Sequence, residues 1–324
     1  MAALIDPMAR GPEIVELRHL AGWELDPLLL EETVEWQREL DWDFARPADL
    51  VRQFTDVRAL TGYALLDRGE VAGYGYSVLE DHKGLIGDLY IRSAWRNQDY
   101  ESRLFRSLLD NLIATPRVRR IESQLMLVDP AVACTLQKER FIRTQERMLM
   151  SLDIAEAPPM SPGAAFEQYR IEPWADYHHE SAAGVIALAY GNHVDSQIND
   201  QYRTLAGARR FIYNIVQFPG CGTFFRPASF VAFDPETTSM AGIALASFVG
   251  DEVGHITQLC ITPGLRGKGL GYELLRQAAG ALRLHGAKRI SLTVTCANTE
   301  AIRLYERCGF SDVRRFSAYM WGSY

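Results

Sequence analysis

The stretch QLCITPGLRGKGLGYELLRQAA, residues Gln258–Ala279, holds a strand, a glycine-rich turn and a helix in immediate succession. Apolar and polar residues alternate up to Ile261, which predicts a strand that Pro263 ends. After the turn RGKGLG, leucines and alanines recur at helical spacing. Such a turn exposes backbone N–H groups at the positive end of the helix dipole. The stretch therefore predicts a site for phosphate oxygens.

Two common phosphate-binding fingerprints fit this turn poorly. The Rossmann fingerprint reads G-x-G-x-x-G, whereas the turn reads G-x-G-x-G. A P-loop needs serine or threonine after its lysine, whereas Lys268 is followed by glycine. The turn thus matches neither class of nucleotide site well.

Outward from the turn, the C-terminal half predicts the element order β-β-β-α-β-α-β, a mixed sheet with helices packed on it. SFVAFD and AGIALASFVG predict a hairpin. HITQLCI predicts the next strand, with His255 on the same face as Leu259 and Ile261. RISLTVT and RRFSAYMW predict two further strands. Between these two, Asn298 is a suitable N-cap for a helix that ends at Gly309.

The N-terminal half repeats this unit in a weaker form. Shifting DLYIRSAWRNQDYESRLFRSLL by 259 − 89 = 170 residues places Leu89 on Leu259 and Arg96 on Arg266. After a slip of one residue, RRIESQLM matches KRISLTVT. We therefore predict a tandem duplication, with a mixed α/β fold in each copy.

The first copy lacks the glycine turn, because RNQDYE replaces RGKGLG. Asp99 and Glu101 stand where the second copy has glycines, and carboxylates there would repel a pyrophosphate and block approach to the backbone. Leu136 and Arg140 replace a tyrosine and a glycine of the second copy. We expect a first lobe that keeps the fold and has lost the phosphate site.

A proline-rich segment, AEAPPMSPGAA, divides the chain almost in half. It cannot continue a helix or a central strand. We therefore expect a first domain at residues 1–154, a linker at 155–165 and a second domain at 166–324. A chain of 324 residues can bury a core in each.

Composition limits the class of protein. Apolar residues make up 48% and charged residues 23%, as in globular proteins, and a net charge of −7 disfavours nucleic acid as the main partner. The five cysteines form no CxxC pair or metal-ligand spacing, and no apolar run approaches the ~18 residues of a membrane span. His178, His179 and Glu180 have no third ligand at a fixed spacing and predict a solvated helix face. We expect a cytoplasmic protein with no metal and no membrane partner.

Two motifs of the second copy resemble those of the GNAT (Gcn5-related N-acetyltransferase) superfamily. Arg266-x-x-Gly269-x-Gly271 resembles its R/Q-x-x-G-x-G/A signature. CANTEAIRLYERCGF resembles the second family motif, in the right order and at the right separation. The resemblance covers the C-terminal half well and the N-terminal half only in its skeleton. The tandem arrangement is similar to that of mycothiol synthase-like proteins.

This resemblance implies acetyl-CoA as cosubstrate and a primary amine as acceptor, joined by direct attack in a ternary complex. It implies that the turn binds the coenzyme A pyrophosphate and that the preceding strand pairs with the pantetheine arm. It also implies Tyr305 as the general acid for the departing thiolate and His255 as a candidate base. The implied cofactor-binding residues are Leu259, Cys260, Ile261, Arg266, Gly267, Lys268, Gly269, Leu270, Gly271, Tyr272, Asn298 and Ala301.

Several alternatives stay open at this level. An alkylammonium with a pKa near ~10 must lose a proton before it attacks, and an imidazole, a tyrosine or a bridging water can carry that proton. Small amines, amino sugars and peptide N-termini all remain as acceptors. Asp195, Asp200 and Tyr202 could receive a cationic amine or form a solvated polar helix. The alternative function is a non-catalytic acyl-CoA-binding or regulatory module, and the sequence does not decide the oligomeric state.

Overall fold

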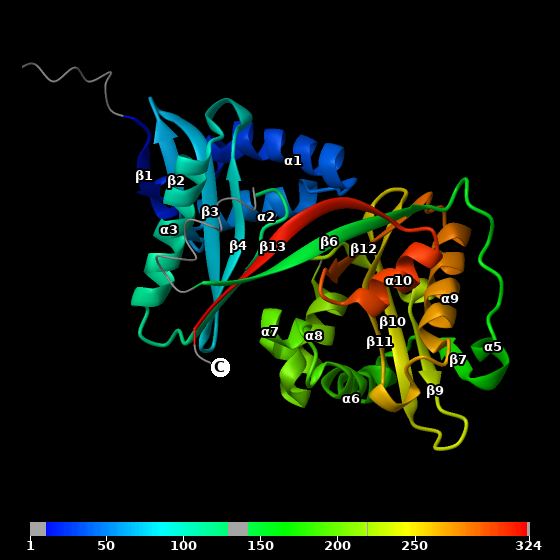
Figure 1. Cartoon of the computed structure of the whole chain (residues 1–324). Helices are drawn as coiled ribbons and strands as arrows, with labels where there is room; N and C mark the ends of the chain where they lie inside the picture. The colour runs from blue at the N-terminus through cyan, green and yellow to red at the C-terminus, as the bar shows by residue number, and fades with distance from the viewer. Residues whose placement is uncertain (1–10, 129–141, 219, 323–324) are drawn as a thin grey trace, which may run out of the picture. The chain divides into compact units, whose positions relative to one another are not determined.

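The structure, a computed structural model, describes residues 11–128, 142–218 and 220–322 (Figure 1). Its contacts form two compact units. Within the described residues, unit 1 comprises 11–36, 44–128, 142–144 and 316–322, and unit 2 comprises 37–43, 145–218 and 220–315. The predicted fold, a mixed sheet flanked by helices in each copy, is confirmed.

Unit 1 is built on a sheet with the strand order β1-β2-β3-β4-β5-β13, in which only the β4–β5 pair is parallel. Helix α3 packs on this sheet through an apolar stripe that includes Leu104 and Leu108, both fully buried. The strands are β1 (Glu13–Glu16), β2 (Thr61–Asp67), β3 (Glu70–Glu80), β4 (Lys83–Ile91), β5 (Arg120–Gln124) and β13 (Ser311–Gly322). The helices are α1 (Asp26–Leu40), α2 (Ala45–Asp56) and α3 (Gln98–Ala114).

Unit 2 repeats this architecture with the strand order β6-β12-β11-β10-β9-β7, and its short strand β8 pairs with β10. The strands are β6 (Arg143–Asp153), β7 (Arg170–Pro173), β8 (Thr223–Phe224), β9 (Phe230–Phe233), β10 (Met240–Gly250), β11 (Val253–Ile261) and β12 (Arg289–Thr295). The helices are α5 (Ala165–Gln168), α6 (His179–Tyr190), α7 (Asp195–Ile198), α8 (Leu205–Gln217), α9 (Leu270–Leu284) and α10 (Thr299–Arg307). From β9 to β13 the elements follow the predicted order.

The sheet of unit 2 has an apolar cluster on each face. One cluster joins α9 to the sheet and contains Ile256, Leu259 and Ile261 of β11. The other joins α6 and α8 to the sheet and contains Cys260. Strand β11 is therefore covered on both faces, and its backbone leads directly to the glycine-rich turn.

The last strand of each repeat lies in the sheet of the other unit. Strand β6 follows the first repeat in sequence but pairs with β12 of unit 2 from Arg147 to Asp153. Strand β13 follows the second repeat, and its residues Ala318–Gly322 pair with β5 of unit 1. Tyr319 of β13 is buried in the core of unit 1, where it contacts Phe105 with ring centres 5.2 Å apart. Each sheet is thus completed by a strand of the other repeat.

The proline-rich segment contacts α9 within unit 2. The Tyr272 hydroxyl donates to the Ser161 carbonyl at 2.8 Å, and the Gly163 N–H donates to the Glu273 carboxylate at 3.3 Å. Arg283 donates to the Ala157 carbonyl at 2.8 Å. These contacts hold the segment along the helix. The division into domains at 1–154 and 166–324 stays a prediction.

Unit 1 buries two carboxyl groups next to one another. Glu32 of α1 is fully buried and Asp88 of β4 nearly so. The Tyr74 hydroxyl donates to Asp88 at 3.0 Å, and the Leu89 N–H donates to it at 2.8 Å. Burial raises the pKa of both carboxyls, and the charge of Asp88 raises that of Glu32 further. At least one of the two carboxyls is therefore expected to stay protonated at pH values where an exposed carboxyl is ionised.

Candidate active site

The glycine-rich turn leaves the N-terminus of α9 without a side-chain cap. Gly267 and Gly269 have φ values of +75° and +83°, which side chains rarely adopt, and Gly269 itself is the N-cap. At Gly271, by contrast, an added Cβ would meet only ordinary contacts at 3.7 Å or more. The fold itself therefore does not demand the third glycine, whereas a ligand approaching the backbone would. The first N–H groups of α9 are available to an anion.

The equivalent helix of unit 1 is closed to an anion. Helix α3 begins at Gln98, and the Asn97 side chain accepts the Tyr100 N–H at 2.9 Å. Asp99 and Glu101, which we predicted at the turn, lie in the first turn of this helix, and Glu101 is buried. Leu136 and Arg140 lie outside the described residues.

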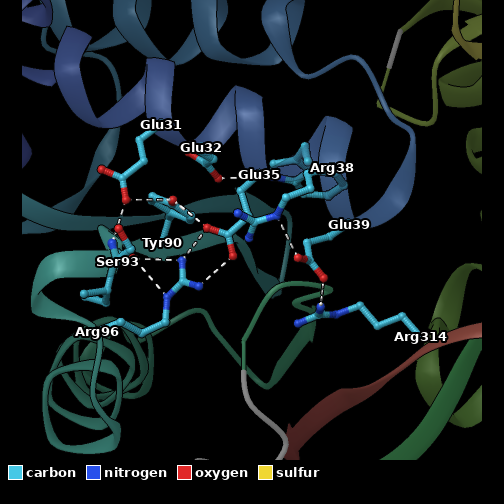
Figure 2. Close-up of polar contacts among 11 residues, drawn as sticks. Glu31, Glu32, Glu35, Arg38, Glu39, Tyr90, Ser93, Arg96 and Arg314 are labelled. Carbon is cyan, nitrogen blue, oxygen red and sulfur yellow. Dashed lines mark hydrogen bonds and ion pairs between the residues drawn. The ribbon is translucent and has the colours of Figure 1, made fainter.

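Arginines of the two repeats make the same contact with the strand that precedes them. Arg96 donates through Nε to the Ile91 carbonyl at 3.2 Å, and Arg266 donates to the Ile261 carbonyl at 3.3 Å. In unit 1 the guanidinium also forms a two-pronged ion pair with Glu35 of α1, at 2.6 and 2.7 Å (Figure 2). In unit 2 it donates to the Ala189 carbonyl near the end of α6, at 2.6 Å. Arg266 thus fixes the start of the turn.

A cavity of about 710 Å³ opens beside this turn in unit 2. One wall is the turn and the end of β11, and another is α10. Strands β11 and β12 pair only over Val253–Ile256 and Arg289–Leu292, so the part of β11 that lines the cavity lies beyond their pairing. Ten of the twelve predicted cofactor residues line it: Leu259, Cys260, Ile261, Arg266, Gly267, Gly269, Gly271, Tyr272, Asn298 and Ala301. Lys268 and Leu270 do not.

Tyr305 of α10 lies at the wall of this cavity. It is 8% exposed, and no residue in the described part of the chain hydrogen-bonds its hydroxyl. Burial, and then the negative charge of Asp195, raise the pKa of the phenol above its ordinary range. Tyr305 therefore keeps its proton at neutral pH and can donate it. The Asn298 side chain caps α10 by accepting the Ala301 N–H at 3.3 Å.

A β-bulge changes which residues of β11 share a face. Leu245 pairs with Gln258 and Ala246 with Ile256, so Thr257 is an extra residue. The prediction that His255 shares the face of Leu259 is therefore wrong, because the extra residue interrupts the alternation.

The structure does not bring His255 into the cavity. Its side chain is 3% exposed, its Nδ1 lies 2.9 Å from the Ser291 hydroxyl, and the Trp42 ring packs against it at 5.0 Å. Burial, and then the positive charge of Arg147, lower the pKa of His255 to about 3. The imidazole is therefore neutral at pH 7.

Two residues that we did not single out line the cavity beside Tyr305. Tyr190 ends α6, and His193 follows it. Tyr190 accepts a hydrogen bond from the Gln258 amide at 3.0 Å and stacks on Tyr202 with ring centres 4.5 Å apart. Asp195 accepts from the Thr295 hydroxyl and lies 3.6 Å from His193. The only signal in the sequence for Tyr190 and His193 was their position at and after the end of the first helix of the second repeat.

Other reactive groups of unit 2 have structural roles. Burial raises the pKa of the Cys260 thiol to about 12, so it is protonated and a poor nucleophile. His178 is buried and lies 3.1 Å from Glu172, so the expected solvated face was wrong at that residue. Across the described ranges, no group of three or more potential ligands could hold a metal ion. No helix in these ranges is long and apolar enough to span a membrane.

The segment that holds these motifs is similar to known proteins. Residues 192–310 match the acetyltransferase (GNAT) family. Streptothricin acetyltransferase of Streptomyces lavendulae is 40% identical over 73 residues, which is 22% of this chain and 39% of that protein. Six further curated relatives are matched over 20–50% of their own length. Mycothiol acetyltransferase of Thermobispora bispora is 26% identical over 253 residues, which covers 76% of this chain and 79% of that protein.

Solved structures share the tandem fold. A GCN5-related N-acetyltransferase from Sphaerobacter thermophilus aligns with a TM-score of 0.67 at 16% identity, covering 96% of each chain. A tandem GNAT protein from the clavulanic acid biosynthesis pathway aligns with a TM-score of 0.63 at 16% identity, covering 96% of this chain and 98% of that one. At this identity the likeness concerns the fold alone.

Proposed function

Because residues 192–310 match the acetyltransferase (GNAT) family and the whole chain has the fold of a tandem GNAT protein, we propose that unit 2 is an acetyl-CoA-dependent N-acetyltransferase. The observation that carries this proposal is the cavity of unit 2. It joins an uncapped, glycine-rich helix start to a buried tyrosine hydroxyl that has no partner in the described part of the chain.

Each wall of the cavity has a part in the reaction. The N–H groups at the start of α9 bind the pyrophosphate, and the backbone of Leu259–Ile261 pairs with the pantetheine arm. The acceptor nitrogen attacks the thioester carbonyl directly, and Tyr305 protonates the thiolate as it leaves. Cys260 takes no covalent part, because its thiol stays protonated. A small-molecule or peptide amine is the acceptor class.

The pH profile of the reaction identifies the base. His255 remains a predicted base, but a pKa of about 3 lies far below the ~10 of an alkylammonium, so the proton transfer is strongly uphill. We expect kcat/KM to rise with pH through the ionisation of the acceptor amine itself. This rising limb should survive in His255→Ala. A limb that the substitution abolishes or displaces would establish His255 as the base.

Release of coenzyme A thiol from acetyl-CoA tests the function. The assay uses a panel of small amines, amino sugars and peptides, and compares the wild type with Tyr305→Phe. Amine-dependent thiol release that Tyr305→Phe slows supports the enzyme. Binding of acetyl-CoA with no thiol release for any acceptor class would favour the alternative, a non-catalytic acyl-CoA-binding or regulatory protein, because binding needs the turn but not Tyr305.

A further inference from the structure

Helix α10 presents two arginines to the cavity of unit 2. Arg303 and Arg307 are exposed, line the cavity and lie one helical turn apart. Neither forms a hydrogen bond or an ion pair with any residue that the structure describes. Every other arginine in the described part of unit 2 interacts with a neighbouring group, for example Arg276 with Glu273 and Arg289 with Asp41.

Two unpaired arginines at this spacing are unfavourable unless an anion is present. Like charges at positions i and i+4 of a helix destabilise it, by about 0.2–0.5 kcal/mol. Among the residues that line the cavity, Arg266 adds a third positive charge, against the single carboxylate of Glu300. Lys268 lies exposed in the same turn as Arg266, outside this lining. This part of the cavity therefore has a net positive charge, suited to an anion with more than one charge.

The position of Arg303 and Arg307 on α10, rather than in the glycine-rich turn, indicates which anion they bind. A pyrophosphate is expected at the uncapped start of α9, beside α10, where backbone N–H groups suffice: a Cβ on Gly271 would lie 3.7 Å from Leu304 of α10. A phosphomonoester carries nearly two charges at neutral pH and presents three oxygens, which two guanidinium groups can grip together. The arginines are thus suited to a second, terminal phosphate of the same ligand.

We propose that Arg303 and Arg307 form a subsite for a phosphomonoester, the 3′-phosphate of coenzyme A. They thereby make unit 2 select coenzyme A over its 3′-dephospho form. This inference rests on the proposed function, because that function supplies the ligand.

Calorimetric titration of the full chain with coenzyme A and with 3′-dephospho-coenzyme A tests the subsite. The wild type should bind coenzyme A about 10- to 100-fold more tightly, the usual gain from charge-assisted contacts to one phosphate. In the double variant Arg303→Gln/Arg307→Gln this preference should fall to within about twofold, with the Kd for the dephospho form unchanged. Arg209→Gln, an exposed arginine of α8 paired with Glu180, is the matched control and should keep the full preference.

The possible failures are distinguishable. Equal binding of both forms by the wild type would overturn the subsite alone and leave the proposed function standing. Equal weakening of both forms in the double variant, with thermal unfolding unchanged, would assign the arginines to the pyrophosphate and also overturn it. Absence of binding by either form to the wild type would overturn the proposed function and the subsite together.

Discussion

Tyr305 owes its proposed role to its surroundings. A tyrosine on a helix usually packs in the core, but the Tyr305 hydroxyl lies at the wall of a cavity. Burial and the nearby carboxylate of Asp195 both raise the pKa of this hydroxyl, so it stays protonated. We predict that Tyr305→Phe lowers kcat by about 10²–10⁴, because a general acid is lost, with the Kd for coenzyme A little changed. Steady-state kinetics and calorimetry measure the two effects.

The control is Tyr213→Phe, which changes an exposed tyrosine of α8. An unchanged kcat in Tyr305→Phe would remove Tyr305 from the mechanism.

The buried pair Glu32 and Asp88 makes the stability of unit 1 depend on pH. Both carboxyls have a folded-state pKa above the unfolded value, near ~4.3 for a glutamate. Their contribution to stability is therefore complete below that unfolded value and is lost as pH rises through the folded value. We predict that Glu32→Gln flattens this loss, so that its unfolding midpoint in urea, followed by circular dichroism, falls less than that of the wild type between pH 5 and 9. The exposed Glu13→Gln should behave as the wild type; an identical pH slope in Glu32→Gln would contradict the prediction.

The sequence predicts the position of some site residues but not the surroundings of others. Tyr305 and Asn298, which line the cavity, could be singled out because motif spacing within one helix fixes their place. The surroundings of His255 could not be found in this way, because Trp42 lies 255 − 42 = 213 residues away in sequence and yet covers its ring. Burial by such a distant segment decides the pKa of a histidine, and no local pattern encodes it.

At the scale of elements, the turn and the start of α9 act together. We predict that Gly269→Asp weakens coenzyme A binding at least about 100-fold, because a like-charge contact at ~4 Å costs on the order of 4 kcal/mol. Calorimetry measures the affinity, and thermal unfolding checks that the fold persists. The matched control is Gly286→Asp, which also replaces a glycine of positive φ, +94°, but beyond the far end of the same helix. Binding retained by Gly269→Asp would show that the turn does not hold the ligand.

The strands were predictable as elements but not in every register. The alternation HITQLCI identified β11 correctly, whereas the extra residue at Thr257 reversed the side chains that precede it. A bulge depends on the pairing with β10, which the sequence of one strand does not specify. The start of α3 was likewise unforeseen, because Asn97 caps that helix two positions earlier than the aligned turn suggests.

At the scale of the whole molecule, we expect the second repeat to bind coenzyme A and the first repeat not to bind it. We predict that calorimetric titration with coenzyme A saturates at one molecule per chain, because Asn97 caps α3 and Glu31 accepts the Ser93 N–H at 2.6 Å in unit 1 (Figure 2). The duplication and the loss of the first glycine turn were both visible in the sequence. Two equivalents bound per wild-type chain would contradict the assignment of a single site.

The exchange of final strands has a consequence for synthesis on the ribosome. Strand β5 ends at Gln124, but the part of β13 that pairs with it begins at Ala318, so 318 − 124 = 194 residues of translation separate the two. At a translation rate of ~5–20 residues per second, strand β5 of the nascent first repeat stays without its β13 partner for roughly 10–40 s. An open edge is a template for pairing with other chains. Slow translation of the second half should therefore favour aggregation of the nascent chain, or its retention by chaperones.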